Sequence, residues 1–130
     1  MRTITKDVGV RIGEEVYTFQ LKKMDAFSGM GVLRLLKRYQ SDQSETFQSL
    51  YDRMFMNLSR EELCELTRAC MNHICVKLPG GWQPVMMGAD WGWPDLEYDL
   101  KACQELMHYE VLWTMQDFFV ENVSTSPAGT

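Results

Sequence analysis

The sequence predicts an α+β fold that is mainly α-helical, with an N-terminal β-hairpin packed on four to five helices. Two patterns predict it. Apolar and polar residues alternate near the N-terminus, as in strands, and from residue 26 onward apolar residues recur every three or four positions, as in amphipathic helices. The chain has 130 residues, of which 45% are hydrophobic. This is enough to bury a core, and we expect a single globular domain over residues 1–123.

The hairpin is predicted over about residues 7–22. A glycine-led turn at residues 13–15 separates two alternating runs, and the second run is rich in residues that favour strands. Because an isolated hairpin is only marginally stable in water, its apolar face must cover another part of the fold or a partner. The apolar positions are Val8, Val10, Ile12, Tyr17, Phe19 and Leu21.

Two helices are predicted after the hairpin. The first begins at Ala26, where either Asp25 or Ser28 can act as the N-cap. A polar stretch over residues 40–44 separates it from the second, whose apolar positions span residues 47–58.

A third helix begins with a capping box, in which Ser59 is the cap and Glu62 lies three residues further on. We expect this helix to end near Val76, because Pro79-Gly80-Gly81 cannot continue it. Three of the four cysteines then fall inside one helix, where we expect reduced, structural thiols. They are Cys64, Cys70 and Cys75.

Residues 79–94 are predicted to form a loop, with a short extended piece at 85–87, because they hold four of the nine glycines and three of the four prolines. Three interpretations of the loop stay open. Its rings form a platform on which a ligand stacks, they cover the helices from solvent, or with the methionines they form an adaptable surface for another protein. The side chains concerned are Trp82, Met86, Met87, Trp91 and Trp93.

The last helical region is predicted over about residues 95–118. Asp95 is its expected N-cap, and a break near Lys101 divides the region into two helices. Residues 124–130 are small and polar, and we expect them to be a disordered tail.

The net charge of −5 is distributed unevenly, with +4 over residues 1–40 and −9 over residues 41–130. This asymmetry is compatible with head-to-tail contact between copies, and a chance imbalance on a solvated surface explains it equally well. The acidic total argues against a dedicated nucleic-acid binder, although the basic set could contact nucleic acid or an acidic partner. The basic set is Lys22, Lys23, Arg34, Lys37 and Arg38, and the acidic residues of the last helical region include Glu97, Asp99, Glu105 and Glu110.

The sequence has no run approaching the roughly 20 apolar residues of a membrane-spanning helix, and the first seven residues lack the apolar stretch of a secretory signal. We therefore expect no membrane contact and a cytoplasmic location. None of the common catalytic or phosphate-binding motifs occurs, so we expect neither an enzyme nor a cofactor.

Cysteine and histidine side chains suggest zinc at first sight. Cys70, His73 and Cys75 are closely spaced, and His108 follows later. Zinc knuckles, however, pair their ligands on turns, whereas these residues lie inside a predicted helix with Cys75 on a different face. We therefore predict no metal site, and we keep a small zinc- or nucleic-acid-binding regulatory protein as the alternative function.

Three segments form a recognisable pattern. Residues 13–21, Gly-Glu-Glu-Val-Tyr-Thr-Phe-Gln-Leu, lead directly into Met24-Asp25-Ala26-Phe27 and then into the basic helix segment 32–38, Val-Leu-Arg-Leu-Leu-Lys-Arg. The last helix closes with residues 113–119, which end in paired phenylalanines. The pattern resembles the tail assembly chaperones of long-tailed, siphovirus-type bacteriophages, which often open with such a hairpin and end in a helix with paired aromatics. The resemblance covers the first third of the chain and the last helix.

The resemblance implies a function in phage tail morphogenesis. A tail assembly chaperone binds the tape measure protein, keeps its long apolar helices soluble and helps to recruit subunits of the tail tube (major tail) protein. It self-associates, here as an expected head-to-tail oligomer, acts in the host cell cytoplasm and is absent from the mature virion. Members of the family are often also made in a longer, frameshifted form. The candidate interaction residues are Tyr17, Phe19, Lys22, Lys23, Arg34, Lys37, Arg38, Trp82, Met86, Met87, Trp91 and Trp93.

Overall fold

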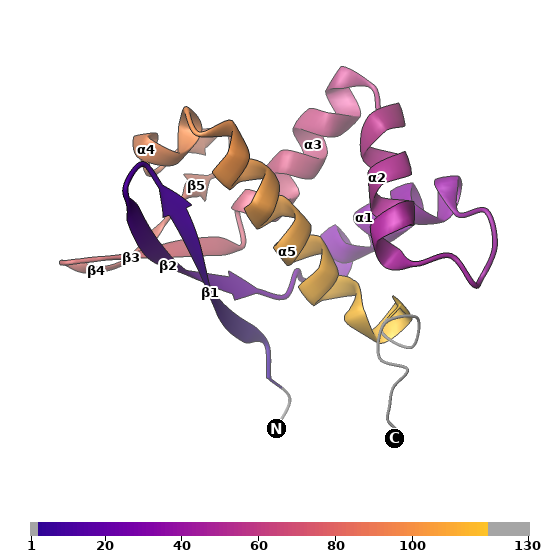
Figure 1. The fold of residues 1–130 in the computed structure, drawn as a ribbon, viewed down its shortest axis with the longest axis horizontal. Helices are drawn as coiled ribbons and strands as arrows, with labels where there is room; N and C mark the ends of the chain where they lie inside the picture. The colour runs from indigo at the N-terminus through magenta and orange to yellow at the C-terminus, as the bar shows by residue number, and fades with distance from the viewer. Residues whose placement is uncertain (1–2, 120–130) are drawn as a thin grey trace.

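A four-stranded antiparallel sheet and three helices enclose a long central helix in the computed structural model, which describes residues 3–119 (Figure 1). The predicted α+β class, with an N-terminal hairpin packed on helices, is confirmed. The strands are β1 Thr5–Ile12, β2 Glu15–Lys22, β3 Ile74–Leu78, β4 Gly81–Pro84, β5 Met86–Met87 and β6 Asp90–Trp91. The helices are α1 Ala26–Tyr39, α2 Phe47–Asn57, α3 Arg60–Met71, α4 Pro94–Glu97 and α5 Leu100–Phe119.

The main sheet has the strand order β1-β2-β3-β4, and β5 and β6 form a separate small pair. The predicted hairpin is confirmed as β1 and β2, with Val8 opposite Phe19. Gly13 adopts a φ of 64° in the turn, a left-handed conformation that glycine tolerates best. One face of β2 enters the core, where Phe19 and Leu21 are buried.

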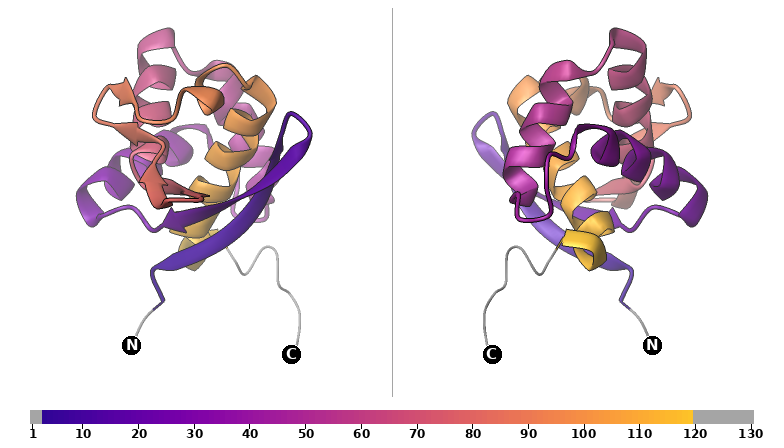
Figure 2. Two further views of the ribbon diagram at one scale, coloured as in Figure 1. Left: turned by 90° about the vertical axis from the view of Figure 1, so that its left-hand side faces the viewer. Right: turned by 90° about the vertical axis from the view of Figure 1, so that its right-hand side faces the viewer.

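Helix α5 lies between the sheet and helices α1–α3, as the turned views also show (Figure 2). It contacts β1, β2 and each of the other four helices. Its buried residues follow one another around the helix instead of forming one stripe, so α5 is enclosed on several sides. They are Ala102, Leu106, Met107, Glu110, Val111, Met115 and Phe119.

The helix starts follow the capping chemistry of the sequence. The Asp25 carboxylate accepts a hydrogen bond from the Ser28 backbone N–H at the start of α1, so Asp25 is the cap. The capping box of α3 is confirmed, because Ser59 and Glu62 each accept from the other's backbone N–H. Such caps satisfy the N–H groups that a helix start leaves without partners.

The predicted end of the third helix near Val76 is wrong. Helix α3 ends at Met71, and residues 74–78 form β3, which pairs antiparallel with β2 and so places Cys75 in a strand. The apolar positions Ile74 and Val76 alternate with polar ones and face the core. Pairing with the free edge of β2 satisfies the backbone of this segment better than another turn of helix.

The predicted loop at 79–94 is more structured than expected, since β4, β5 and β6 lie within it. Asp95 does not cap the last helix. Instead α4 begins at Pro94, and Asp99 accepts a hydrogen bond from the Ala102 N–H at the start of α5. The helix break therefore lies just before the predicted position, Lys101, and the predicted tail at 124–130 lies outside the described residues.

A test of this packing is available at two glycines. A Cβ at Gly92 would come within 2.5 Å of the Pro84 carbonyl oxygen, whereas a Cβ at Gly80 would meet no atom within 4 Å. We expect Gly92→Ala to lower the free energy of unfolding by about 1–3 kcal/mol. Urea denaturation measures this change, with Gly80→Ala as the matched control that stays within about 1 kcal/mol of the wild type. Equal effects of the two substitutions would contradict the described contact between residues 84 and 92.

Candidate interaction surfaces

Helices α1 and α3 leave between them a groove of about 450 Å³, which we call the α1–α3 groove. The start of one helix lies beside the end of the other. Apolar and small side chains line its middle, and charged side chains line its two walls. The apolar and small residues include Phe27, Gly31, Leu35, Leu66 and Ala69, and the charged residues are Arg34, Arg38, Glu62 and Glu65.

Polar contacts join the two walls at both ends of the groove. At one end Arg38 Nη1 donates to Glu62 Oε2 at 2.6 Å. At the other end His73 Nε2 lies 3.3 Å from Asp25 Oδ1. Hydrogen bonds from Ser28, with a smaller contribution from His73, lower the pKa of Asp25 to about 2, so this carboxylate is charged at neutral pH. The ends of the groove are thus fixed while its middle stays open.

Helix α1 leaves much of its apolar surface uncovered. Of its 14 residues, Val32 and Leu36 are buried. Phe27 and Met30 expose 83% and 57% of their surface, and a Cβ at Gly31 would meet no atom within 4 Å. Exposed apolar side chains beside an open groove are typical of a surface that binds another protein.

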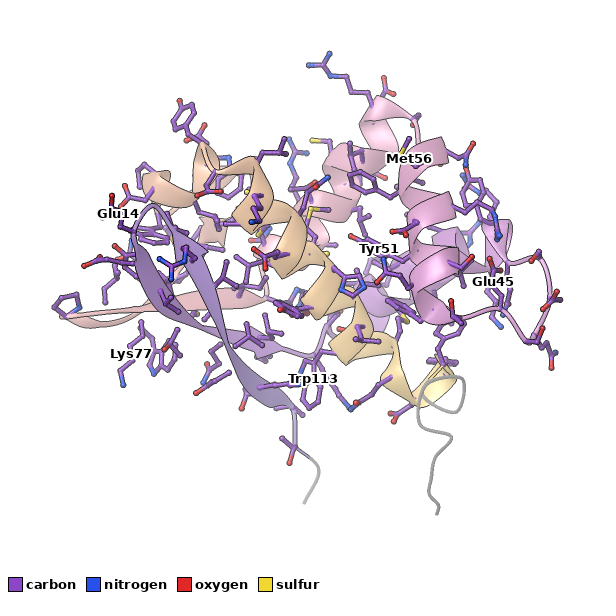
Figure 3. The ribbon with its side chains drawn as sticks, in the orientation of Figure 1. Glu14, Glu45, Tyr51, Met56, Lys77 and Trp113 are labelled. Atoms are coloured by element: carbon purple, nitrogen blue, oxygen red, sulfur yellow. The ribbon has the colours of Figure 1, made fainter. Side chains whose placement is uncertain are left out.

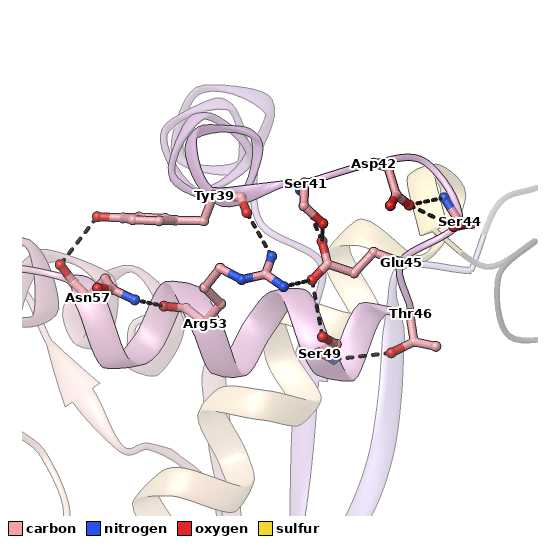
Figure 4. Close-up of polar contacts among 9 residues, drawn as sticks. All are labelled: Tyr39, Ser41, Asp42, Ser44, Glu45, Thr46, Ser49, Arg53 and Asn57. Carbon is pink, nitrogen blue, oxygen red and sulfur yellow. Dashed lines mark hydrogen bonds and ion pairs between the residues drawn. The ribbon is translucent and has the colours of Figure 1, made fainter.

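A polar network holds the far end of α1 against α2 (Figure 4). Arg53 forms an ion pair with Glu45 and donates to the Tyr39 carbonyl oxygen at 2.8 Å. Glu45 also accepts from the backbone and hydroxyl of Ser41 and from the hydroxyl of Ser49. The Arg53 guanidinium is the main cause that lowers the pKa of Glu45 to about 2. The wall formed by α1 is therefore anchored although few of its residues are buried.

A second groove, also of about 450 Å³, lies between α2 and α5. Its character is aromatic and acidic, with Tyr51, Phe55 and Tyr109 beside Asp52 and Glu105. The Tyr51 side chain extends from α2 toward α5 (Figure 3). Charge and aromatic faces together suit a basic partner surface. We call this the α2–α5 groove.

Of the aromatic and methionine side chains proposed from the sequence as interaction residues, some are buried and others are exposed. Trp93 is buried, and its ring centroid lies 5.0 Å from that of Tyr17 and 6.0 Å from that of Phe19. Met86 is buried as well. The ring contacts of Trp93 stabilise the packing of the hairpin against residues 84–93. Phe19, Met86 and Trp93 are all buried and offer almost no surface to a partner in this conformation.

Other residues of the same segment remain accessible. Trp82 exposes 43% of its surface on the edge strand β4, and Met87 exposes 61%. Trp91 is half-buried. The segment thus combines a buried ring with exposed ones, which the sequence pattern alone did not separate.

The basic candidates fall into two groups. Lys22, Arg34 and Lys37 are exposed and form no ion pair within residues 3–119. Arg38 is paired with Glu62, and Lys23 is engaged by the last helix. The Lys23 Nζ lies 4.8 Å from the centroid of the Trp113 ring and 3.9 Å from Asp117 Oδ2.

The cysteine and histidine side chains considered for zinc lie in different surroundings. Cys70 is fully buried, and burial raises the pKa of its thiol well above the usual value. The His73 ring contacts the Ala69 carbonyl oxygen and Asp25. Cys75 lies on β3, and within residues 3–119 no three His, Cys, Asp or Glu side chains are grouped closely enough to hold a metal ion.

Glu110 is placed differently from the sequence prediction. It was expected on the acidic surface of the last helix, but it is fully buried. Oε2 accepts from the Thr114 hydroxyl at 3.3 Å, while Oε1 has no hydrogen-bond partner among the described residues. Burial raises the pKa of Glu110 to about 9. Its position four residues after Leu106 and next to Val111 was the signal for the buried face.

None of the helices between residues 3 and 119 combines the length and the apolar character needed to cross a membrane. The chain matches no protein-family profile, no curated protein and no solved structure.

The buried carboxyl predicts how stability depends on pH. In the unfolded chain Glu110 loses its proton near pH 4.5, whereas in the folded chain it keeps the proton to about pH 9. Between these values the unfolded state binds fewer protons, so this group makes the free energy of unfolding fall as pH rises. We expect Glu110→Gln to raise the free energy of unfolding by roughly 1–3 kcal/mol at pH 8, with a smaller gain at pH 5.

Urea denaturation at pH 5 and pH 8 measures the effect. Glu97→Gln, at an exposed position on α4, is the control, and it should leave the pH dependence unchanged. A gain at Glu110→Gln that is equal at both pH values would show that the carboxyl does not titrate as its burial requires.

Proposed function

We propose that this chain is a phage tail assembly chaperone that binds the tape measure protein and keeps it soluble. The observation that carries the proposal is the uncovered apolar surface of α1 beside the α1–α3 groove, on a chain whose core is otherwise closed around α5. A holding chaperone needs accessible, adaptable apolar surface on a stable body, and flexible methionine side chains are suited to such contacts.

The segments that carry the family resemblance also lie together. The Met24 backbone N–H donates to the Thr114 hydroxyl at 3.1 Å, which joins the start of α1 to α5. Lys37 Nζ lies 5.9 Å from the centroid of the Phe119 ring. Segments far apart in the sequence therefore form one local structure, which supports reading them as one pattern.

The remaining parts of the proposal follow from the same family. The chaperone recruits tail tube subunits to the tape measure protein, acts in the host cell cytoplasm and leaves before the virion is complete. No observation on the described residues favours the zinc- or nucleic-acid-binding alternative, since the candidate ligands lie apart and part of the basic set is engaged within the chain.

Co-expression tests the chaperone function. The wild-type chain should raise the soluble yield of the tape measure protein from the same tail gene cluster and co-purify with it. Replacing both Phe27 and Met30 with Ser should remove most of this gain, because it removes apolar contact surface. Met56→Ser is the matched control, since Met56 is 78% exposed on α2 and does not line the groove. A wild-type chain that neither co-purifies nor changes the yield would contradict the function.

Self-association is the second part of the proposal. We propose that the exposed basic face of α1, with Arg34 and Lys37, contacts the acidic α2–α5 groove of the next copy. Two different surfaces that pair in this way give a head-to-tail oligomer without two-fold symmetry.

Light scattering across a salt series tests this contact. Association should weaken as salt rises, and Asp52→Lys with Glu105→Lys should abolish it, because both changes place positive charge in the α2–α5 groove. Glu61→Lys with Glu97→Lys is the control, with two exposed acids outside that groove, and it should leave association intact. A strict monomer at low salt, or a dimer that ignores salt and these changes, would rule out the head-to-tail contact.

A further inference from the structure

Building on the proposed function, we infer that the α1–α3 groove holds one amphipathic helix of the tape measure protein in a single direction. The acidic flank of that helix lies against α1 and its basic flank against α3.

The shape of the groove fits a helix. From Phe27 to Arg38 the α1 wall is about 17 Å long, roughly three turns at 1.5 Å per residue. The small residues Gly31 and Ala69 stand on opposite walls, and the space at Gly31 is open. Small residues at a contact let a third helix approach closely and insert its apolar side chains between the walls. The exposed Phe27 and the half-buried Leu35 supply apolar surface for these side chains.

An extended chain would fit less well. The groove lies between two helices, and none of the residues that line it belongs to a strand. An extended occupant would therefore meet no strand edge with which its backbone N–H and C=O groups could pair. A helix satisfies these groups by its own backbone hydrogen bonds.

The two walls carry opposite charge. Arg34 lines the α1 side and Glu65 the α3 side, both are exposed, and neither forms an ion pair within residues 3–119. The contacts that join the walls lie at the two ends of the groove, where Arg38 pairs with Glu62 and Asp25 contacts His73. An occupant in the middle therefore meets a positive wall on one side and a negative wall on the other. Turning the helix end for end would place like charges together, so charge selects one direction.

Charge also distinguishes the tape measure helix from the α1 helix of a second copy. The α1 sequence contains no acidic residue, and its exposed charged residues are all basic. A second α1 in the groove would bring positive charge against Arg34. The groove therefore suits a helix that carries acids on one flank and bases on the other.

Binding of a designed probe to the full chain tests the groove. The probe is a fluorescent helical peptide of about 18 residues, roughly five turns, with a leucine stripe flanked by Glu on one side and Lys on the other. Gly31→Leu fills the open space and should weaken binding by about tenfold or more, which corresponds to about 1.4 kcal/mol. Gly31→Ala is the matched control and should keep the affinity within about threefold, or roughly 0.7 kcal/mol. Equal affinity for all three chains would overturn the site.

The direction of binding has its own readout. With a spin label at the probe's N-terminus, NMR signals should broaden near one end of the groove only. In the Arg34→Glu, Glu65→Arg variant, the broadening should move to the opposite end. Broadening at both ends in the wild type, or an unchanged end in the variant, would overturn the directional part.

Co-purification of the tape measure protein separates this inference from the proposed function. Loss of co-purification in Gly31→Leu, with retention in Gly31→Ala, supports both. Full co-purification with Gly31→Leu overturns the groove as the site while the chaperone function stands. A wild-type chain that binds the probe but not the tape measure protein overturns the occupant and the proposed function together.

Discussion

The enclosure of α5 is the constraint on which the rest of this structure depends. A 20-residue helix that contacts β1, β2 and every other helix fixes where each of them can lie. The hairpin, which would be marginal alone, gains its stability by covering one side of α5. Helices α1, α2 and α3 cover other sides of α5. Residues 84–93 pack against the hairpin through the Trp93 ring. Burial of α5 therefore determines both the core and which surfaces of the surrounding helices and strands stay exposed.

One consequence is that a carboxylic acid lies inside the core. Glu110 belongs to the enclosed part of α5, next to Thr114, whose hydroxyl also accepts from the Met24 backbone. Keeping a proton on this group at neutral pH costs free energy that a neutral side chain would avoid. The chain retains it at the junction of α5 with the start of α1, where the exposed apolar surface begins. The stability of that junction is thereby linked to pH.

The sequence predicted what depends on local pattern and missed what depends on distant pairing. The hairpin, the three helix starts and the capping box follow from spacing and cap chemistry close to each residue. The end of α3 could not be read locally, because Ile74 and Val76 suit either a helix stripe or a strand, and the free edge of β2 decides between them.

The α1–α3 groove could be predicted only in part from the sequence, for the same reason. The basic residues of α1 were recognised from its pattern, but Glu62 and Glu65 become the opposite wall only once α3 folds against α1. The exposure of Phe27 and Met30 was not predicted either, because it depends on which side of α1 is buried, and the structure buries Val32 and Leu36 instead.

We propose that α1 and α3, and not residues 79–94, receive the partner. Amide hydrogen exchange of the free chain and of its complex with the tape measure protein tests this most directly. We expect complex formation to slow exchange in residues 27–38 and 62–69, while exchange in α5 stays slow in both states because that helix is already enclosed. Slower exchange confined to residues 81–91, with no change along α1 and α3, would contradict it.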